Sequence, residues 1–450
     1  MNTKPLESKE QLSMLPMLSQ NPESLKTLHT AEDFRYELLK QIENAKQRIY
    51  IVALYLENDD AGREIFTALY EAKQKQPTLD VNVLVDWHRA QRGLIGAESS
   101  DGNAALYREF SEKYKHSINV LGVPVRNKEV FGVLHLKGFI FDDTVVYSGA
   151  SLNDVYLAHK EKYRCDRYHL LNNQFLANSM VSLIKKTLIA SPAVNSLSQQ
   201  NRPNTKSLKP AIKELRKQLS VVNYQFTPQM RKSGEIGITP LIGLGRKGNK
   251  LNSHILLLLA SAVSEITICT PYFNFPKPIA KELKKALRRG VKVTVIVGDK
   301  TANDFYIAPE EEFKTIAGLP YLYEINLRNF AKANETYIAN RQLSLRLWKH
   351  ENNSFHLKGI WVDNEFTLIT GSNLNPRAWK LDLENGLLLQ DPEQLLLGEK
   401  QAELEVILRH TQLIATYKQV DKLDSYPLEV KRLIKRIKRI KADHILNQIL

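Results

Sequence analysis

The two halves of this 450-residue chain show the same order of expected helices and strands, and this repeat limits the possible folds most strongly. In the first half, a helical stretch ending at Asn44 precedes a strand (Arg48–Tyr55), a helix and a second strand (Val81–Asp86). In the second half, the helical HILLLLASAV precedes a strand (Glu265–Tyr272), a helix and a further strand (Val291–Asp299). Because repeated β-α-β alternation is typical of α/β domains, we predict two tandem copies of one α/β domain.

A segment rich in Ser, Asn and Pro separates the two copies. Residues 191–210 read SPAVNSLSQQNRPNTKSLKP, a composition that favours an exposed linker over a helix or a strand. We therefore expect an N-terminal domain at residues 1–210 and a C-terminal domain at residues 211–450.

The strongest motif occurs once in each half. HLKGFIFD spans His135–Asp142, HLKGIWVD spans His356–Asp363, and both fit the pattern H-x-K-x-x-x-x-D. One match would be weak evidence, because three fixed positions can coincide by chance in a chain of this length. Two matches 221 residues apart, at equivalent places in a duplicated domain, indicate a shared function.

A histidine and a lysine side by side suit the handling of phosphate. Residues i and i+2 of a strand emerge on the same face, so each motif is expected to present one imidazole and one ammonium together. If the domains pack with pseudo-twofold symmetry, the two pairs surround one point. Lys137 and Lys358 would then neutralise phosphate oxygens, while one imidazole attacks phosphorus and the other serves as acid and base. The alternative, two pairs of ordinary exposed strand residues, is disfavoured by the duplication.

The remaining residue of each motif is an aspartate, and both aspartates fall where a hairpin is expected to turn. Asp142 and Asp363 are therefore predicted to hold the turn, or to orient the site, more than to react. The proposed chemistry needs no metal ion or other cofactor, and the sequence offers no evident carboxylate cluster that would bind a metal.

Two further carboxylates are candidates for orienting the histidines. Glu384, just before an apolar strand, is predicted to pair with His356, and Asp166 is the corresponding candidate for His135. A carboxylate bonded to an imidazole fixes its tautomer and stabilises the imidazolium, so both acids are included among the catalytic candidates.

Short polar segments follow each motif, SGASLN in the first half and TGSNLN in the second. Their side chains could donate hydrogen bonds to phosphate oxygens, or they could cap the following helix, and the sequence leaves both interpretations open. The candidate phosphate ligands in these segments are Ser151, Asn153, Asn373 and Asn375.

The paired motifs resemble those of the phospholipase D superfamily, and further segments are similar to the bacterial phosphatidylserine synthases within it. The segments that carry the closer resemblance are DWHRAQRG (Asp86–Gly93), VGDKTANDFYI (Val297–Ile307), LPYLYEINLR (Leu319–Arg328), LRLWK (Leu345–Lys349) and NLNPRAWKLDLEN (Asn373–Asn385). The resemblance runs along the whole chain. It implies two phospholipase D-like domains, each a mixed sheet flanked by helices, related by pseudo-twofold symmetry and sharing one active site.

The same resemblance implies a CDP-diacylglycerol:serine O-phosphatidyltransferase that works through a covalent phosphohistidine. His135 would attack the phosphatidyl phosphorus of CDP-diacylglycerol, and His356 would protonate the leaving CMP and then deprotonate L-serine. Because both motifs lie in one chain, an oligomer is not required to complete the site.

The net charge of +14 and the pI of about 9.4 indicate an anionic partner, which leaves nucleic acid, nucleotide and acidic lipid open. Neither a signal peptide nor a bilayer-spanning apolar run is evident, and two lone cysteines fit a reducing compartment. We expect a cytoplasmic protein that associates peripherally with the inner face of the cytoplasmic membrane.

The C-terminus offers a route to that membrane. Residues 427–450 are predicted to form a basic amphipathic helix that lies on an anionic surface, although a surface helix packed on its own domain fits the pattern equally well. The candidate membrane-facing side chains are Lys431, Arg432, Lys435, Arg436, Lys438 and Arg439.

Other functions remain to be weighed against phosphatidylserine synthesis. A nuclease of the same superfamily would share the chemistry, but no aromatic-interleaved basic groove or nucleic-acid module is apparent, so no specific nucleic acid is expected. A phospholipase or a cardiolipin synthase would use another acceptor. A catalytically inactive binding protein would be expected to lose some of the four His and Lys residues, and this chain has them all.

Overall fold

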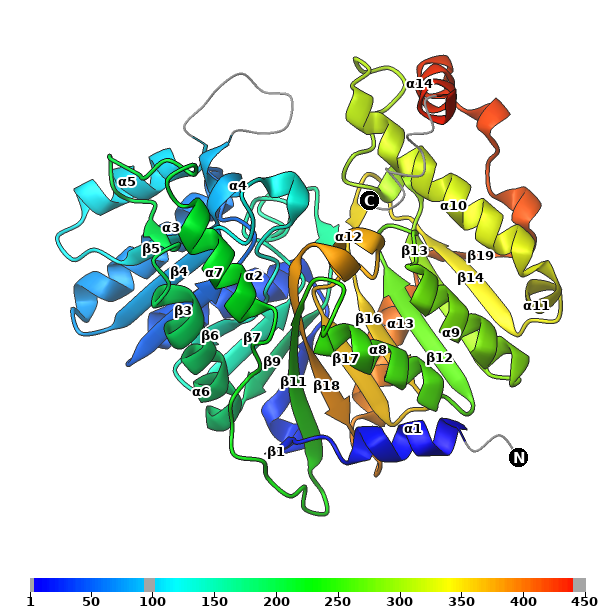
Figure 1. Cartoon of the computed structure of the whole chain (residues 1–450), viewed down its shortest axis with the longest axis horizontal. Helices are drawn as coiled ribbons and strands as arrows, with labels where there is room; N and C mark the ends of the chain where they lie inside the picture. The colour runs from blue at the N-terminus through cyan, green and yellow to red at the C-terminus, as the bar shows by residue number, and fades with distance from the viewer. Residues whose placement is uncertain (1–3, 93–101, 440–450) are drawn as a thin grey trace.

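The computed structural model describes residues 4–92 and 102–439. Two sheets with their helices lie side by side, the first half of the chain forming one side of the molecule and the second half the other (Figure 1). The long strands β11 (Ile236–Leu244) and β18 (Leu383–Gln390) run down the middle, next to the first half. The predicted α/β class is confirmed.

The first sheet is mixed. Its parallel part contains β3, β4 and β5, and its antiparallel part joins β3 to β6, β7, β9 and β2. Within the described residues its eight strands follow the order β10 (Asn195–Ser196), β5 (Asn119–Val123), β4 (Asp80–Asp86), β3 (Arg48–Val52), β6 (Phe139–Phe141), β7 (Thr144–Ser148), β9 (Tyr168–Asn172) and β2 (Leu25–Leu28).

The second sheet repeats this pattern. Strands β12, β13 and β14 are parallel, and β12 joins the antiparallel series β16, β17, β18 and β11. The nine strands that the structure describes follow the order β1 (Leu18–Gln20), β11, β18, β17 (Phe366–Thr370), β16 (Gly359–Val362), β12 (Glu265–Thr270), β13 (Lys292–Gly298), β14 (Leu343–Trp348) and β19 (Thr411–Ile414). The repeat read from the sequence is therefore a repeat of topology.

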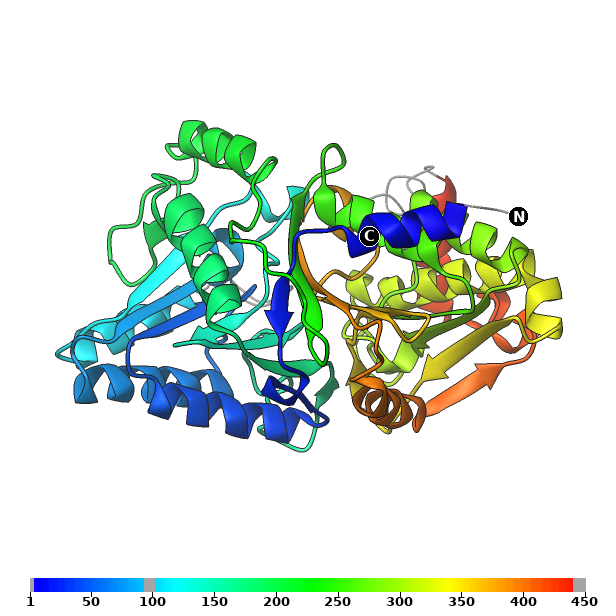
Figure 2. The same cartoon turned by 90° about the horizontal axis from the view of Figure 1, so that it is seen from below.

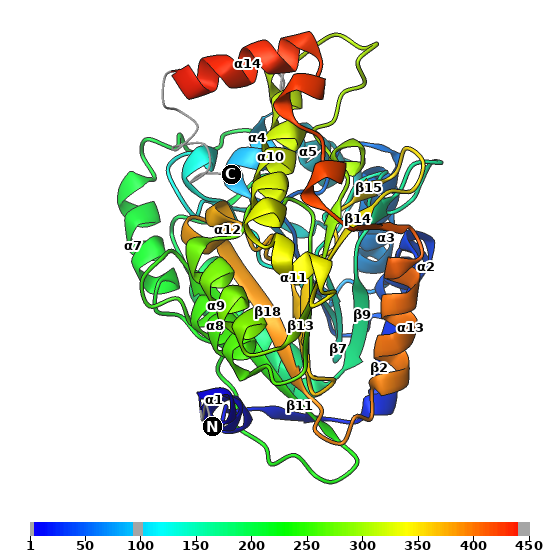
Figure 3. The same cartoon turned by 90° about the vertical axis from the view of Figure 1, so that its right-hand side faces the viewer.

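Helices cover both faces of each sheet, which is why the central strands are apolar along most of their length. Figure 2 shows α2 and α3 on one side of the first sheet and α6 and α7 on the other, and Figure 3 shows α8 and α9 opposite α13. The helices are α1 (Lys4–Ser13), α2 (Ala31–Asn44), α3 (Asp60–Lys75), α4 (Trp87–Gln91), α5 (Ala104–Lys113), α6 (Gln174–Leu183), α7 (Lys209–Leu219), α8 (Lys250–Ser261), α9 (Lys277–Arg288), α10 (Leu319–Ala333), α11 (Glu335–Ala339), α12 (Pro376–Lys380), α13 (Leu397–Leu408) and α14 (Leu428–Arg439).

The chain does not divide between its two cores at residue 210. Helix α1 packs against α8, and β1 pairs with β11, so the N-terminal segment contributes to the second sheet. Helix α7 lies beyond the predicted boundary, yet its apolar side chains Ile212, Leu215 and Leu219 belong to the core of the first half. These exchanged segments tie the halves together, and the division into domains at residues 1–210 and 211–450 stays a prediction.

None of the helices in the described part of the chain is long and apolar enough to cross a bilayer.

Candidate active site

The segment that carries His135 and Lys137 is extended but lies just before β6, outside any strand of its own sheet. It pairs instead with the second half of the chain. The His135 backbone N–H donates to the Leu383 carbonyl at 3.0 Å, and the Asn385 side chain bonds both the N–H and the carbonyl of Lys137 at 2.8 Å. The expectation that both residues stand on a strand is therefore wrong in detail. The hydrogen bonds that a neighbouring strand of the same sheet would make to this segment come instead from residues of β18.

The segment that carries His356 and Lys358 is held by the first half in the same way. Strand β15 (Ser354–Phe355) pairs in parallel with β8 (Arg164–Cys165), and the His356 N–H donates to the Cys165 carbonyl at 2.8 Å. Each histidine is thus positioned by the opposite half of the molecule, and both half-sites meet within one chain.

This exchange decides which carboxylate contacts which histidine. Glu384 Oε2 lies 2.9 Å from His135 Nδ1, and Asp166 Oδ2 lies 2.9 Å from His356 Nδ1. The predicted pairing, Glu384 with His356 and Asp166 with His135, is wrong. The reason is local: Glu384 follows Leu383, which receives the His135 N–H, and Asp166 follows the Cys165 that receives the His356 N–H.

The two lysines complete a compact charged centre that is almost entirely buried. Lys358 Nζ contacts His356 and lies 3.3 Å from Asp166 Oδ2, whereas Lys137 Nζ donates to the Ala150 carbonyl at 3.1 Å. The Tyr156 hydroxyl lies 3.0 Å from His356 Nδ1 and borders this charged centre on one side. Two imidazoles and two ammoniums therefore gather at one place, as the motif predicted.

Burial and mutual repulsion lower the pKa of every cationic group in this centre. The pKa of His135 lies well below its usual value because of burial and the charges of Lys137 and Lys358. Burial, then Lys358, lowers the pKa of His356 to about 4, and the same causes lower the pKa of Lys137 to about 7. A bound anion would offset the repulsion between these cationic groups and favour their charged forms, so the centre is arranged to bind negative charge.

The two carboxylates respond in opposite directions. Burial and then Asp382 raise the pKa of Glu384, against the influence of Lys137. Burial also raises the pKa of Asp166, but Lys358 and His356 outweigh it and hold that pKa below its ordinary value. The lowered pKa of Asp166 favours its charged form at neutral pH, whereas the raised pKa of Glu384 favours its neutral form.

The motif aspartates make no contact with the histidines or lysines, because they lie at the far end of the following strand. Asp142 has φ 49° in the β6–β7 turn, and its carboxylate accepts the backbone N–H groups of Lys46, Gln47 and Arg48 at 2.7–3.0 Å. Asp363 has φ 51° and does the same for residues 263–265. Asp142 thus holds the start of β3, and Asp363 holds the start of β12. Their inclusion among the catalytic candidates is corrected, because both stabilise a turn and the strand beside it.

In the polar segments after the motifs, both candidate side chains that form hydrogen bonds accept a backbone N–H group three residues later in the chain. Asn153 accepts the Tyr156 N–H at 3.0 Å, and Asn375 caps α12 by accepting the Ala378 N–H at 2.9 Å. Ser151 is buried, and Asn373 Oδ1 is buried without a hydrogen-bond partner among the described residues. Of the four candidates, Asn373 retains the clearest unused hydrogen-bonding capacity.

Two glycines next to the lysines were not foreseen as functional. A Cβ on Gly149 would lie 2.8 Å from Asp166 Oδ1 and 2.9 Å from Lys358 Nζ, and a Cβ on Gly371 would lie 2.5 Å from Lys137 Cγ. Gly149 thus makes room for Asp166 and for Lys358 of the other half, and Gly371 makes room for Lys137 of the other half. The signal was available in the sequence, since both segments begin with a hydroxyl residue followed by Gly.

Alanine at either glycine is expected to lower activity by about 10- to 100-fold, because the added methyl displaces a lysine or carboxylate from the site. Gly398→Ala in α13 is the matched control, since a Cβ there meets no atom within 4 Å. The measurement is kcat of the catalysed phosphoryl transfer, with thermal unfolding of each variant alongside. Full activity in a folded Gly371→Ala variant would contradict this role.

One group of side chains in the described ranges has the geometry to hold a metal ion, contrary to the expectation of no such cluster. Ligand atoms of Asp60, Asp154 and His159 lie within 4.8 Å of one another. Lys160 already contacts both carboxylates, at 3.0 Å from Asp60 and 2.7 Å from Asp154. Lys160 therefore offsets one of these two negative charges without an ion, and the cluster takes no part in the centre described above.

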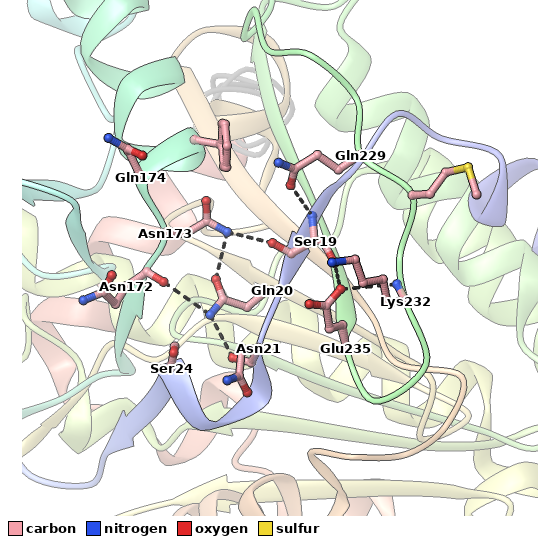
Figure 4. A pocket seen from close by; sticks show the side chains of 12 residues that line it. Ser19, Gln20, Asn21, Ser24, Asn172, Asn173, Gln174, Gln229, Lys232 and Glu235 are labelled. Atoms are coloured by element: carbon pink, nitrogen blue, oxygen red, sulfur yellow. Dashed lines mark hydrogen bonds between the residues drawn. The ribbon is translucent and has the colours of Figure 1, made fainter.

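A polar pocket at the opposite end of the central strands is also separate from this centre. Ser19, Gln20, Asn173 and Glu235 line it, and hydrogen bonds among them and their neighbours tie β1 to β9 (Figure 4). Gln20 pairs with the start of β11, whereas Glu384 pairs with Gly243 near its end, which is about 20 Å away along the strand. The hydrogen bonds around this pocket therefore join the two halves of the molecule, and the pocket has a structural role.

A comparison with known families gives an independent result. The model described as "Cardiolipin synthase, PLD-like domain" matches residues 38–157 and 255–410, which include both motifs. The CDP-diacylglycerol–serine O-phosphatidyltransferase of Escherichia coli is 48% identical over 442 residues, covering 98% of each chain. The chain belongs to the phosphatidylserine synthases of the phospholipase D superfamily.

Two further comparisons place it within this phosphatidylserine synthase family. The Haemophilus influenzae CDP-diacylglycerol–serine O-phosphatidyltransferase is 46% identical over 447 residues, covering 98% of each chain. The crystal structure of phosphatidylserine synthase from Haemophilus influenzae superposes with a TM-score of 0.95 at 45% identity, covering 99% of this chain and 100% of that one. The predicted membership and the predicted fold, two phospholipase D-like halves, are both confirmed.

Proposed function

We propose that the chain transfers the phosphatidyl group of CDP-diacylglycerol to L-serine through a covalent phosphatidyl-histidine on His135, and forms phosphatidylserine and CMP. The observation that carries this proposal is the pair of crossed histidine–carboxylate contacts around two buried lysines. Family membership supports the choice of substrates.

In the first step His135 Nε2 attacks phosphorus, and the bond between phosphorus and the CMP oxygen breaks. The Nδ1–H of His135 donates to Glu384, which stabilises the positive charge that the ring gains. His356 gives its proton to the leaving CMP oxygen. Lys137 and Lys358 neutralise the non-bridging oxygens, and the negative phosphate raises the low pKa of His356 toward the range in which it can carry that proton.

In the second step neutral His356 takes the proton of the serine hydroxyl, and the serine oxygen attacks phosphorus. The bond between phosphorus and His135 Nε2 breaks, so the free imidazole is restored and phosphatidylserine leaves. His356 ends protonated, ready for the next CDP-diacylglycerol. Asp166 holds Nδ1 of His356 at 2.9 Å through both steps, which fixes Nε2 as the nitrogen that exchanges the proton.

Polar side chains next to the lysines are proposed to bind the remaining phosphate oxygens. The Asn373 amide oxygen has no hydrogen-bond partner among the described residues, so this amide could turn to donate its Nδ2–H to phosphate, and Ser151 stands at the equivalent position of the first polar segment. Asn153 and Asn375 would act indirectly, through the turns that they hold.

A lipid substrate must reach this centre from a membrane, and we propose that α14 contributes an electrostatic contact with the inner, cytoplasmic surface. The helix lies on the outside of α10 (Figure 3). Its apolar side is already covered, because Val430 and Ile434 pack against Tyr321 and Leu322. Its basic side is free, since Arg432, Lys435, Arg436 and Arg439 are exposed. Residues 440–450 of the predicted amphipathic helix lie outside the described residues.

Replacing Arg432, Lys435 and Arg436 together by glutamine is expected to weaken binding to anionic vesicles by about 100-fold, at roughly 1 kcal/mol per basic residue. The fall should shrink as salt is raised. Neutralising Lys281, Lys284 and Arg288 of α9 is the control, because that helix is also basic and exposed. Vesicle sedimentation measures the effect, and equal losses in both variants would exclude a specific role for α14.

The proposed function is tested by CMP release from CDP-diacylglycerol in mixed micelles containing a chelator, with and without serine. Serine-dependent phosphatidylserine formation supports the proposal. Rapid CMP release that yields only phosphatidic acid would indicate a phospholipase, transfer to phosphatidylglycerol would indicate a cardiolipin synthase, and cleavage of DNA without CMP release would indicate a nuclease.

A further inference from the structure

An ion pair beside His356 has no part in the phosphate chemistry described above. Arg164 Nη2 lies 3.0 Å from Asp304 Oδ1, and both side chains are about 13% exposed. The Arg164 guanidinium stacks 4.4 Å above the ring of Tyr156, whose hydroxyl contacts His356. The Tyr272 hydroxyl donates to Asp304 Oδ2 at 2.6 Å, and its ring lies 6.1 Å from the His356 ring. Two tyrosines thus connect the pair to the acid–base histidine.

A carboxylate at this position is unexpected in a centre that binds phosphate. Asp304 is close enough for its charge to act on His356 and Lys358, and it would repel the anionic donor. Its Oδ1 is buried and accepts no hydrogen bond from the described residues, because the contact with Arg164 lacks hydrogen-bond angles. An oxygen that is charged, buried and free of a hydrogen bond is costly unless a ligand completes it.

Resting on the function proposed above, we propose that Arg164 and Asp304 form the acceptor subsite, in which Asp304 binds the ammonium group of serine and Arg164 binds its carboxylate. Serine carries both charges on the carbon next to its hydroxymethyl group. Once the hydroxyl reaches His356, both charges must therefore bind close to that ring, and the pair is linked to the ring through Tyr156 and Tyr272. A planar guanidinium suits a carboxylate, and a carboxylate with open lone pairs suits an ammonium.

The arrangement also explains how a centre built for anions accepts a zwitterion. Arg164 keeps its charge and is fixed by Ser354 Oγ, which accepts from Nε at 3.1 Å, and by the face of Tyr156. Asp304 is fixed by Tyr272. Serine would replace the direct contact between the two side chains with two contacts to itself, so the subsite is preformed and neutral before the acceptor binds.

The test compares serine with two analogues that each lack one charge. 3-Hydroxypropionate lacks the ammonium group and ethanolamine lacks the carboxylate, and both retain the primary hydroxyl. In the full-length enzyme, the serine to 3-hydroxypropionate ratio of kcat/KM is expected to fall by about 10- to 100-fold in Asp304→Asn. The serine to ethanolamine ratio is expected to fall by a similar factor in Arg164→Gln. Where an analogue turns over too slowly, its inhibition constant replaces kcat/KM.

Exchange of labelled CMP into CDP-diacylglycerol without any acceptor reports the first step within each variant. Exchange by the wild type with unchanged ratios in both variants would overturn the acceptor subsite and leave the proposed function intact. Absence of exchange in the wild type would overturn the proposed function itself. Tyr272→Phe removes only the hydroxyl that hydrogen-bonds to Asp304. If Asp304→Asn does not fold, Tyr272→Phe replaces it in the test, and its serine to 3-hydroxypropionate ratio is expected to lie between the wild-type ratio and the one expected for Asp304→Asn. Arg63→Gln, in an exposed pair with Glu109, should leave both ratios unchanged.

Discussion

CMP release by His135→Ala is expected to be at least about 10⁴-fold slower than by the wild type, because the variant lacks the nucleophile that forms the covalent intermediate. Phosphatidylserine formation should fall by the same factor, since no later step can proceed. The fold should survive, because among the described residues the imidazole makes one hydrogen bond, with Glu384, and the backbone bond to Leu383 does not need the side chain. Single-turnover CMP release in detergent micelles measures the loss.

His29→Ala is the control for this result, since His29 is an exposed histidine outside the centre. It should retain wild-type activity. His356→Ala separates the two roles, because a leaving group without its proton donor slows CMP release while His135 can still be modified. A His135→Ala enzyme that forms a covalent intermediate, with His356→Ala unable to do so, would reverse the assigned roles.

Asp166→Asn is expected to slow serine transfer by about 10³- to 10⁴-fold, because it removes the carboxylate that fixes the His356 tautomer and supports its imidazolium. The pH dependence should change in a defined direction. Burial and Lys358 lower the pKa of His356 to about 4, and Asp166 opposes them. Without that charge the pKa of His356 falls further, so less imidazolium exists at a given pH. The alkaline limb of the CMP-release profile, on which His356 loses the proton that it donates, should therefore move to lower pH.

Asp142→Asn is the matched comparison, since Asp142 belongs to the motif but bonds only the β6–β7 turn and residues 46–48. It should lower the melting temperature and leave the pH profile in place. Glu384→Gln should affect the step that uses His135. If Asp166→Asn and Asp142→Asn gave the same profile, Asp166 would have no special connection to His356.

Much of this fold could be predicted from the sequence, because the same order of helices and strands occurs in both halves of the chain. The strands at residues 48–52 and 265–270 and the turns at Asp142 and Asp363 were each visible as alternation or turn chemistry in both halves. The pairing of the halves was not visible. Local patterns specify an element and its face, but the contacts of His135 with Leu383 and of His356 with Cys165 join residues that are 248 and 191 positions apart.

This long-range exchange accounts for the failed prediction in the active site. Glu384 and Asp166 were identified as functional carboxylates from their positions before apolar strands, which is a local signal. Their histidines were assigned by proximity within each half, whereas the backbone crosses between the halves. The same limit applies to α1 and β1, whose apolar residues predict burial but not burial against the second sheet.

The covalent intermediate on His135 is the central claim, and trapping it is the most direct test. The enzyme is mixed with CDP-diacylglycerol labelled in the phosphatidyl phosphate, without serine, quenched within milliseconds under conditions that preserve phosphohistidine, and digested. The account predicts label on the peptide that contains His135 in the wild type and its loss when serine is added before the quench. Label on the peptide that contains His356, or serine transfer without any labelled peptide, would contradict it.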